Sequence, residues 1–134
     1  MTLPNWNLNE FYPSFTSDQI NRDILSLKQK TREFSSKFKG KLKSLKKSYL
    51  LKTLVDYEKI EELIQKIKSF AYLTYCTDQL NDKKKKFYQM TEESLSEIEK
   101  AIIFYGIELN NLNDKKLSVF SDSKYKNWIK NHKK

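Results

Sequence analysis

Chain-breaking residues are scarce in this sequence, and their positions limit the folds that it can adopt. The 134 residues include two prolines, Pro4 and Pro13, and two glycines, Gly40 and Gly106. Because proline and glycine are the residues that most often interrupt helices and build tight turns, so small a number suits long helices. A turn-rich β fold would need many more of them. The sequence therefore predicts an all-α fold.

Apolar residues recur every three or four residues in three long segments, which is the spacing of one helix face. The first predicted helix starts after Ser17, a good N-cap with Asp18 in the first turn, and ends near Gly40. The second follows a basic turn over residues 40–48, with Ser48 as its expected N-cap. Their apolar stripes comprise Ile20, Ile24, Leu27, Thr31, Phe34 and Phe38, and then Leu51, Leu54, Tyr57, Ile60, Ile64, Ile67, Ala71 and Thr74.

A break at residues 78–82 precedes the third predicted helix, which stops at residues 110–114. Its apolar stripe comprises Phe87, Met90, Leu95, Ile98, Ala101, Ile102, Tyr105 and Leu109. Two short helices are expected after it, at residues 115–120 and 123–131. The predicted architecture is thus an antiparallel bundle of three long helices plus one or two short C-terminal helices.

A single domain over residues 1–134 is expected for a chain of this length. Residues 17–134 form the bundle, and residues 1–16 form an extended aromatic segment, hereafter the strap. Prolines favour extended geometry, and aromatic side chains offer apolar area that can cover a seam between helices. The strap residues expected to act in this way are Trp6, Phe11 and Tyr12.

The strap also carries a family resemblance. Its residues 3–14 read LPNWNLNEFYPS. This resembles the opening of oligoendopeptidase F-type zinc metallopeptidases, in the thimet-oligopeptidase superfamily, with Asn7 in place of the usual Asp and Phe11 in place of the usual Leu. Similar stretches follow in the family's order, so that the resemblance spans nearly the whole chain. They are Asp18–Leu42, Asp56–Asp78, Phe104–Asp114 and Tyr125–Lys134.

The resemblance implies a non-catalytic role for this chain. Members of that family hold zinc on a His-Glu-x-x-His helix with a further Glu, and such a helix needs two histidines. This chain has one, His132. It would therefore correspond to the N-terminal helical domain, which shapes and gates the channel through which oligopeptides reach a catalytic domain. We expect no catalytic residue, metal site or cofactor in this chain, and zinc in the catalytic domain.

The partner that the resemblance implies is that catalytic metallopeptidase domain, in the same polypeptide or as a separate chain. Oligopeptide substrates would be met only through it. The candidate docking residues are Trp6, Phe11, Tyr12 and Pro13 in the strap, and Tyr125, Trp128 and Ile129 near the C-terminus. For the second group, packing back onto the bundle is the alternative interpretation.

The net charge of +9 is unevenly distributed. Residues 28–52 hold ten Lys or Arg and one acid, residues 115–134 hold seven Lys and one acid, and residues 53–114 hold eight Lys and twelve acids. This pattern suits an alternative function, a stand-alone basic helical module that binds nucleic acid or an acidic protein. Only Arg22 and Arg32 are arginines, and base recognition relies on arginine. Nucleic acid is therefore not the expected partner.

Other features bear on the compartment. A lone cysteine, Cys76, can form no internal disulfide, which suits a reducing environment. No apolar run approaches the roughly 18 residues of a membrane span, and the start of the chain lacks the pattern of a signal peptide. We expect a cytoplasmic protein without membrane contact.

Four further features have a structural explanation and a functional one. Cys76 and His132 are the one nucleophile–base pair of the chain, but Cys76 is expected to be a small packed residue. The run Lys83–Lys86 is expected to be a solvated first turn, with a phosphate-binding patch as the alternative. Gly106 is expected to permit a close helix crossing. An exposed, ion-paired helix face is expected for Glu92, Glu93, Glu97 and Glu99, with a metal site as the alternative.

Overall fold

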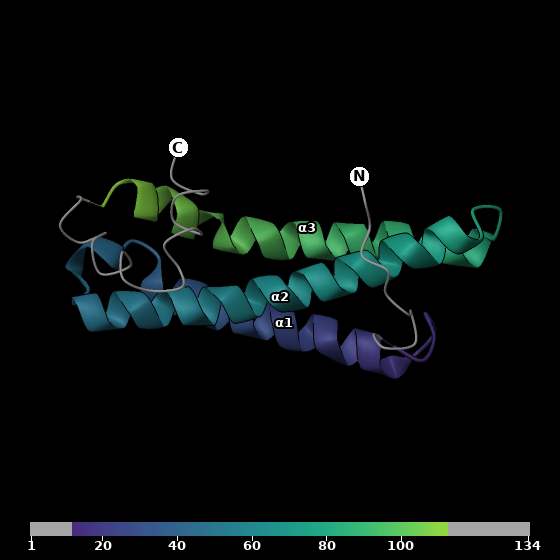
Figure 1. Cartoon of the computed structure of the whole chain (residues 1–134), viewed down its shortest axis with the longest axis horizontal. Helices are drawn as coiled ribbons and strands as arrows, with labels where there is room; N and C mark the ends of the chain where they lie inside the picture. The colour runs from purple at the N-terminus through teal and green to yellow at the C-terminus, as the bar shows by residue number, and fades with distance from the viewer. Residues whose placement is uncertain (1–11, 113–134) are drawn as a thin grey trace.

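Residues 12–112 are described in the computed structural model, and they fold into three antiparallel α-helices (Figure 1). The helices are α1 (Asp18–Phe38), α2 (Lys47–Thr77) and α3 (Asp82–Asn110), with a short 3-10 helix, η2 (Leu42–Ser44), between the first two. Each long helix packs against both others. The predicted all-α bundle of three long helices is confirmed, and this part of the chain contains no strand.

The two ends of α1 follow the local sequence signals. The Ser17 hydroxyl accepts a hydrogen bond from the Gln19 amide at 3.2 Å, and this satisfies one of the amides that a helix start leaves without a partner. Gly40 has φ 77°, a left-handed conformation that residues with a Cβ rarely adopt. The Lys41 amide bonds to the Phe38 carbonyl at 3.0 Å and closes the end of the helix.

The connection from α1 to α2 differs from the prediction. Helix α2 begins at Lys47, so its N-cap is Lys46 and not Ser48 as predicted. The Lys46 side chain makes no capping hydrogen bond. Leu42 and Leu50, on either side of this start, are both fully buried. Burying a leucine contributes about 1.5–3 kcal/mol, more than the ~1 kcal/mol of a cap. Packing therefore sets where the helix starts.

A carboxylate from α3 holds the same connection in place. The Glu108 side chain accepts the Gly40 amide at 2.7 Å and the Leu42 amide at 3.3 Å. These amides lie beyond the end of α1, where no helical carbonyl is available to them. Glu108 thus gives the connection the hydrogen bonds that its own sequence does not supply.

The core follows the predicted stripes with one exception. Met90 is 57% exposed, because the buried positions of α3 run through Thr91, one residue later, and then every three or four residues. The buried apolar residues of the three helices are Ile20, Leu27 and Phe34; Leu50, Leu54, Tyr57, Ile60, Ile64, Ile67, Phe70 and Ala71; and Leu95, Ile98, Ile102, Phe104, Tyr105 and Leu109.

An aromatic group packs in the core towards the end of the bundle that holds the α1–α2 connection. The ring of Phe34 contacts those of Phe104 and Tyr105 at 5.7 and 5.4 Å between centroids, and the rings of Tyr57 and Tyr105 stack at 4.5 Å. The Tyr105 hydroxyl lies 3.0 Å from Thr53 Oγ1, so a buried polar group has a partner. Burial is the main cause that raises the pKa of both Tyr57 and Tyr105.

None of the helices in residues 12–112 is both long enough and apolar enough to cross a membrane. The predictions that concern the first part of the strap and the two short C-terminal helices lie outside the described residues. So do the candidate docking residues Trp6, Phe11, Tyr125, Trp128 and Ile129.

Candidate functional site

Tyr12 fastens the described part of the strap to the bundle. Its side chain is 1% exposed, and its hydroxyl donates a hydrogen bond of 2.6 Å to Asp23 Oδ2 on α1. Its ring meets that of Phe70 on α2 edge to face at 5.1 Å, and Lys66 Nζ lies 4.8 Å from the ring centre. Burial and the bond to Asp23 raise the pKa of Tyr12, so its phenol stays protonated above its ordinary range.

Phe15 extends the same contact to the third helix. Its ring lies 5.7 Å from that of Phe87 on α3, and Phe87 in turn lies 6.2 Å from Phe70. The strap therefore touches all three helices, and the predicted covering of a helix seam by Tyr12 is confirmed. Since Tyr12 is buried in its own bundle, it offers almost no surface to a second domain, whereas Pro13 is exposed.

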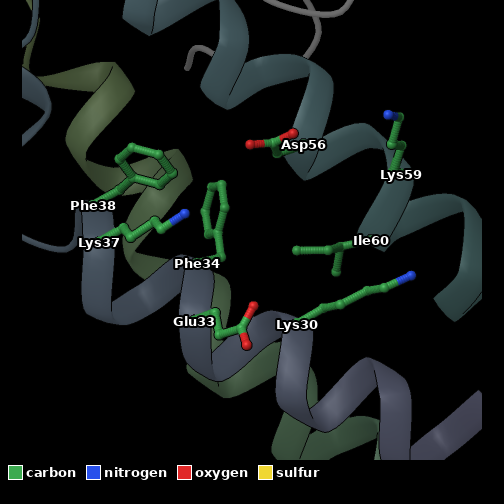
Figure 2. Close-up of a pocket in the computed structure, with 8 residues that line it drawn as sticks. All are labelled: Lys30, Glu33, Phe34, Lys37, Phe38, Asp56, Lys59 and Ile60. Carbon is green, nitrogen blue, oxygen red and sulfur yellow. The ribbon is translucent and has the colours of Figure 1, made fainter.

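A groove of about 330 Å³ runs between α1 and α2 (Figure 2). Its apolar surface consists of Phe34, Phe38 and Ile60, and in the figure the Phe34 ring stands between the side chains of Lys37 and Asp56. The other charged side chains at its edge are Lys30, Glu33 and Lys59, and no ion pair joins the charges of this groove. It can therefore take an amphipathic ligand with an excess of negative charge.

The basic segment at residues 28–52 covers the same end of the bundle. It comprises the second half of α1, the connection through η2 and the first turns of α2. Nearly all of its cationic side chains are exposed to solvent. The exposed ones are Lys30, Arg32, Lys37, Lys39, Lys41, Lys43, Lys46, Lys47 and Lys52.

A second groove of about 330 Å³ lies between α2 and α3, hereafter the α2–α3 groove. It is lined by Tyr57, Glu61, Ile64, Gln65, Ser96, Glu99, Lys100, Ile102 and Ile103. Beside it on α3, Ile103 is 65% exposed and Ile107 is 56% exposed. Residues four apart lie on one helix face, so the two side chains form one apolar ridge along the groove.

The predicted explanation of Gly106 is wrong. A Cβ built on Gly106 would meet nothing within 4 Å, so no neighbouring helix approaches it closely. The acidic face of α3 is as predicted in part: Glu99 forms an ion pair of 2.9 Å with Lys68, and Glu93 and Glu97 are exposed.

The prediction that Cys76 is a small packed residue is wrong. Cys76 lies near the tip between α2 and α3, and it is exposed. Thr74 and Ala71 occupy the inward positions of that last stretch of α2, so Cys76 falls on the outer face. The Lys83–Lys86 run does form a first turn, and the Asn81 side chain accepts the amides of Lys83 and Lys84. This cap, with Asp82, offsets the unfavourable position of four cations at a helix start.

Residues 12–112 bring no three His, Cys, Asp or Glu side chains together in a way that could hold a metal ion. His132 lies outside them, so its relation to Cys76 stays a hypothesis. Comparisons with protein-family models, with curated proteins and with solved structures gave no match for the chain.

Proposed function

We propose that this chain is the N-terminal helical domain of an oligoendopeptidase F-like zinc metallopeptidase. In this role it shapes and gates the access of oligopeptides to a catalytic domain that carries the zinc. The chain does no chemistry itself, and that domain is its partner, in the same polypeptide or as a separate chain. The observation that carries the proposal is Tyr12, because the Tyr-Pro corner of the strap, which is part of the resemblance, also ties the strap to α1 and α2.

A gate requires that the three helices move together as one rigid body. Opening and closing around a substrate are rigid-body movements of packed elements about a few flexible positions. Here the strap contacts α1 through Asp23, α2 through Phe70 and α3 through Phe87. At the other end Glu108 joins α3 to the α1–α2 connection. These contacts at both ends favour movement of the three helices as one body.

The test uses the catalytic part of an oligoendopeptidase F-type enzyme, produced without its own N-terminal helices. Adding this chain should give a stable complex and should slow the cleavage of long quenched fluorescent peptides more than that of short ones. Tyr12→Ala should weaken this effect, and Tyr49→Ala, at a tyrosine that is 54% exposed, should not. Absence of both binding and any change in length preference would overturn the proposal.

One observation favours a second candidate, the basic binding module. The exposed lysines of residues 28–52 and the α1–α2 groove lie at the same end of the bundle. A partner held there through phosphates would lose affinity steeply as salt rises, because its counterions are released on binding. Binding to a labelled DNA duplex or an acidic peptide should then depend on residues 41–47 and not on residues 83–86. The matched sets are Lys41→Glu, Lys46→Glu and Lys47→Glu against Lys83→Glu, Lys85→Glu and Lys86→Glu.

A further inference from the structure

Charged residues recur at a spacing of seven along both sides of the seam between α1 and α2. Seven residues are close to two helical turns, so residues at this spacing lie on one helix face. They are Asp23, Lys30 and Lys37 on α1, and Lys59 and Lys66 on α2. Because the two helices are antiparallel, a step of seven residues forward along α1 matches a step of seven residues back along α2 (Figure 1).

Tyr12 occupies this seam where Asp23 and Lys66 meet. Its hydroxyl donates to Asp23 at 2.6 Å, and Lys66 Nζ lies 4.8 Å from its ring centre. One step of seven residues further on, about 10 Å at 1.5 Å per residue, the seam reaches Lys30 and Lys59. These two lysines line the α1–α2 groove of about 330 Å³. The seam therefore holds an aromatic ring beside a lysine at one position, and within residues 12–112 it forms a groove at the next.

The groove has three cations and two acids in its lining. The cations are Lys30, Lys37 and Lys59, and the acids are Glu33 and Asp56. Glu33 accepts a hydrogen bond of 3.3 Å from a glutamine of the same helix. Within residues 12–112 the three lysines and Asp56 have no hydrogen-bond or ion-pair partner. The lining thus has a net charge of +1, and its cations are available to a ligand.

These charges are separated along the groove (Figure 2). The two acids lie between Lys37 at one end and the pair of Lys30 and Lys59 at the other. A single anion between Lys30 and Lys59 meets two cations, and the acids lie about one turn away on each helix. A polyanion along the whole groove would place further negative charges over Glu33 and Asp56, which opposes its binding.

We propose that the α1–α2 groove binds a small aromatic carboxylate, with its carboxylate between Lys30 and Lys59 and its ring against Phe34, Phe38 and Ile60. This inference depends on neither of the functions proposed above. The three apolar residues provide the surface that a flat ring requires. The volume is near the lower end of the about 300–1,000 Å³ of ligand pockets, so the groove suits one small molecule.

The test is a titration of the full chain with naphthoate, followed by NMR correlation spectra of the backbone amides. The signals that shift should belong to the residues that line this groove. A ligand of this size in an open groove should have a dissociation constant of about 0.1–1 mM. Naphthylmethanol has the same rings without the charge, and it should bind at least about fivefold more weakly.

Variants of the lining separate the contributions of charge and ring. Lys30→Gln and Lys59→Gln should each weaken naphthoate binding about two- to fivefold, as expected for exposed ion pairs. Asp56→Asn should strengthen it about twofold, because it removes a negative charge from the lining. Phe38→Ser should weaken both naphthoate and naphthylmethanol. Lys39→Gln is the matched control, since Lys39 is an exposed lysine of the same segment that does not line the groove.

Three outcomes would overturn the proposal. The first is the absence of amide shifts in the lining at naphthoate concentrations of about 10 mM, well above the expected dissociation constant. The second is an equal loss of affinity in Lys39→Gln and Lys30→Gln, which would mean attraction to the positive charge of the whole chain. The third is equal binding of naphthoate and naphthylmethanol, which would mean that the lysines do not recognise the carboxylate. Circular dichroism checks that each variant keeps its helices.

Discussion

Removing the Tyr12 side chain should destabilise the bundle in two separable steps. Tyr12→Phe deletes the hydrogen bond to Asp23 and leaves the ring in place. Hydrogen bonds to charged groups contribute about 1.5–3 kcal/mol. The loss should fall at the lower end of this range, because Asp23 is half-buried and water can replace the phenol. We expect a decrease of about 1.5 kcal/mol in the free energy of unfolding.

Tyr12→Ala removes the ring as well. Truncating a buried aromatic side chain to alanine costs about 3–5 kcal/mol, and the ring of Tyr12 is 1% exposed and packed against Phe70. The total should therefore lie at about 3–5 kcal/mol. This is a large share of the 5–15 kcal/mol that stabilises an ordinary domain, so partial unfolding at room temperature is expected for this variant.

Thermal and urea unfolding followed by circular dichroism measure both steps. A domain of this size shifts its melting temperature by about 2–8 °C per kcal/mol. Tyr49→Phe and Tyr49→Ala are the controls, since Tyr49 is 54% exposed and should change little. A double-mutant cycle of Tyr12→Phe with Asp23→Asn isolates the hydrogen bond. If Tyr12→Ala melts like the parent chain, the strap does not fasten the bundle, and the argument from its contacts fails.

Three other perturbations test other parts of the structure. Glu108→Ala should cost about 1–3 kcal/mol, since it leaves two connection amides without their acceptor, while Glu97→Ala on the same helix should be near neutral in the same urea titration. Gly106→Ala should stabilise the chain by about 0.5–1 kcal/mol, because alanine favours a helix and its methyl group meets nothing within 4 Å; a lower melting temperature would contradict this. Burial raises the pKa of Tyr57 and Tyr105 in the folded state, so the folded chain favours the protonated phenols. The free energy of unfolding should therefore fall as pH rises above about 10, the pKa of tyrosine in an unfolded chain. Tyr57→Phe should reduce this alkaline loss in unfolding measurements across that pH range.

The helices could be predicted because their determinants are local. The Ser17 cap, the left-handed Gly40 and the three-to-four spacing of apolar residues all act within a few turns of the chain. The prediction that Met90 lies in the core is wrong, because the buried position in that turn is Thr91, one residue later. Periodicity alone does not distinguish neighbours when the apolar residue falls just outside the buried stripe.

The contacts that hold the ends of the bundle could not be predicted, because they join residues far apart in the sequence. Nothing near Glu108 indicates that its carboxylate reaches the amide of Gly40. The same is true of the partnership between Tyr12 and Asp23. The predicted stripe of α3 includes Ile102 and omits Ile103, and Ile103 is indeed exposed, at 65%.

The hydrogen bond from the Leu42 amide to Glu108 makes that amide a reporter of the contact between α3 and the α1–α2 connection. Its hydrogen bond crosses from the first connection to the last turns of α3, and Leu42 itself is fully buried. The amide can exchange with solvent deuterium only when α3 separates from that connection, so its protection records the docking of a helix that lies 66 residues away. During refolding, the same amide should become protected only after all three helices have come together, later than the amides in the middle of α1.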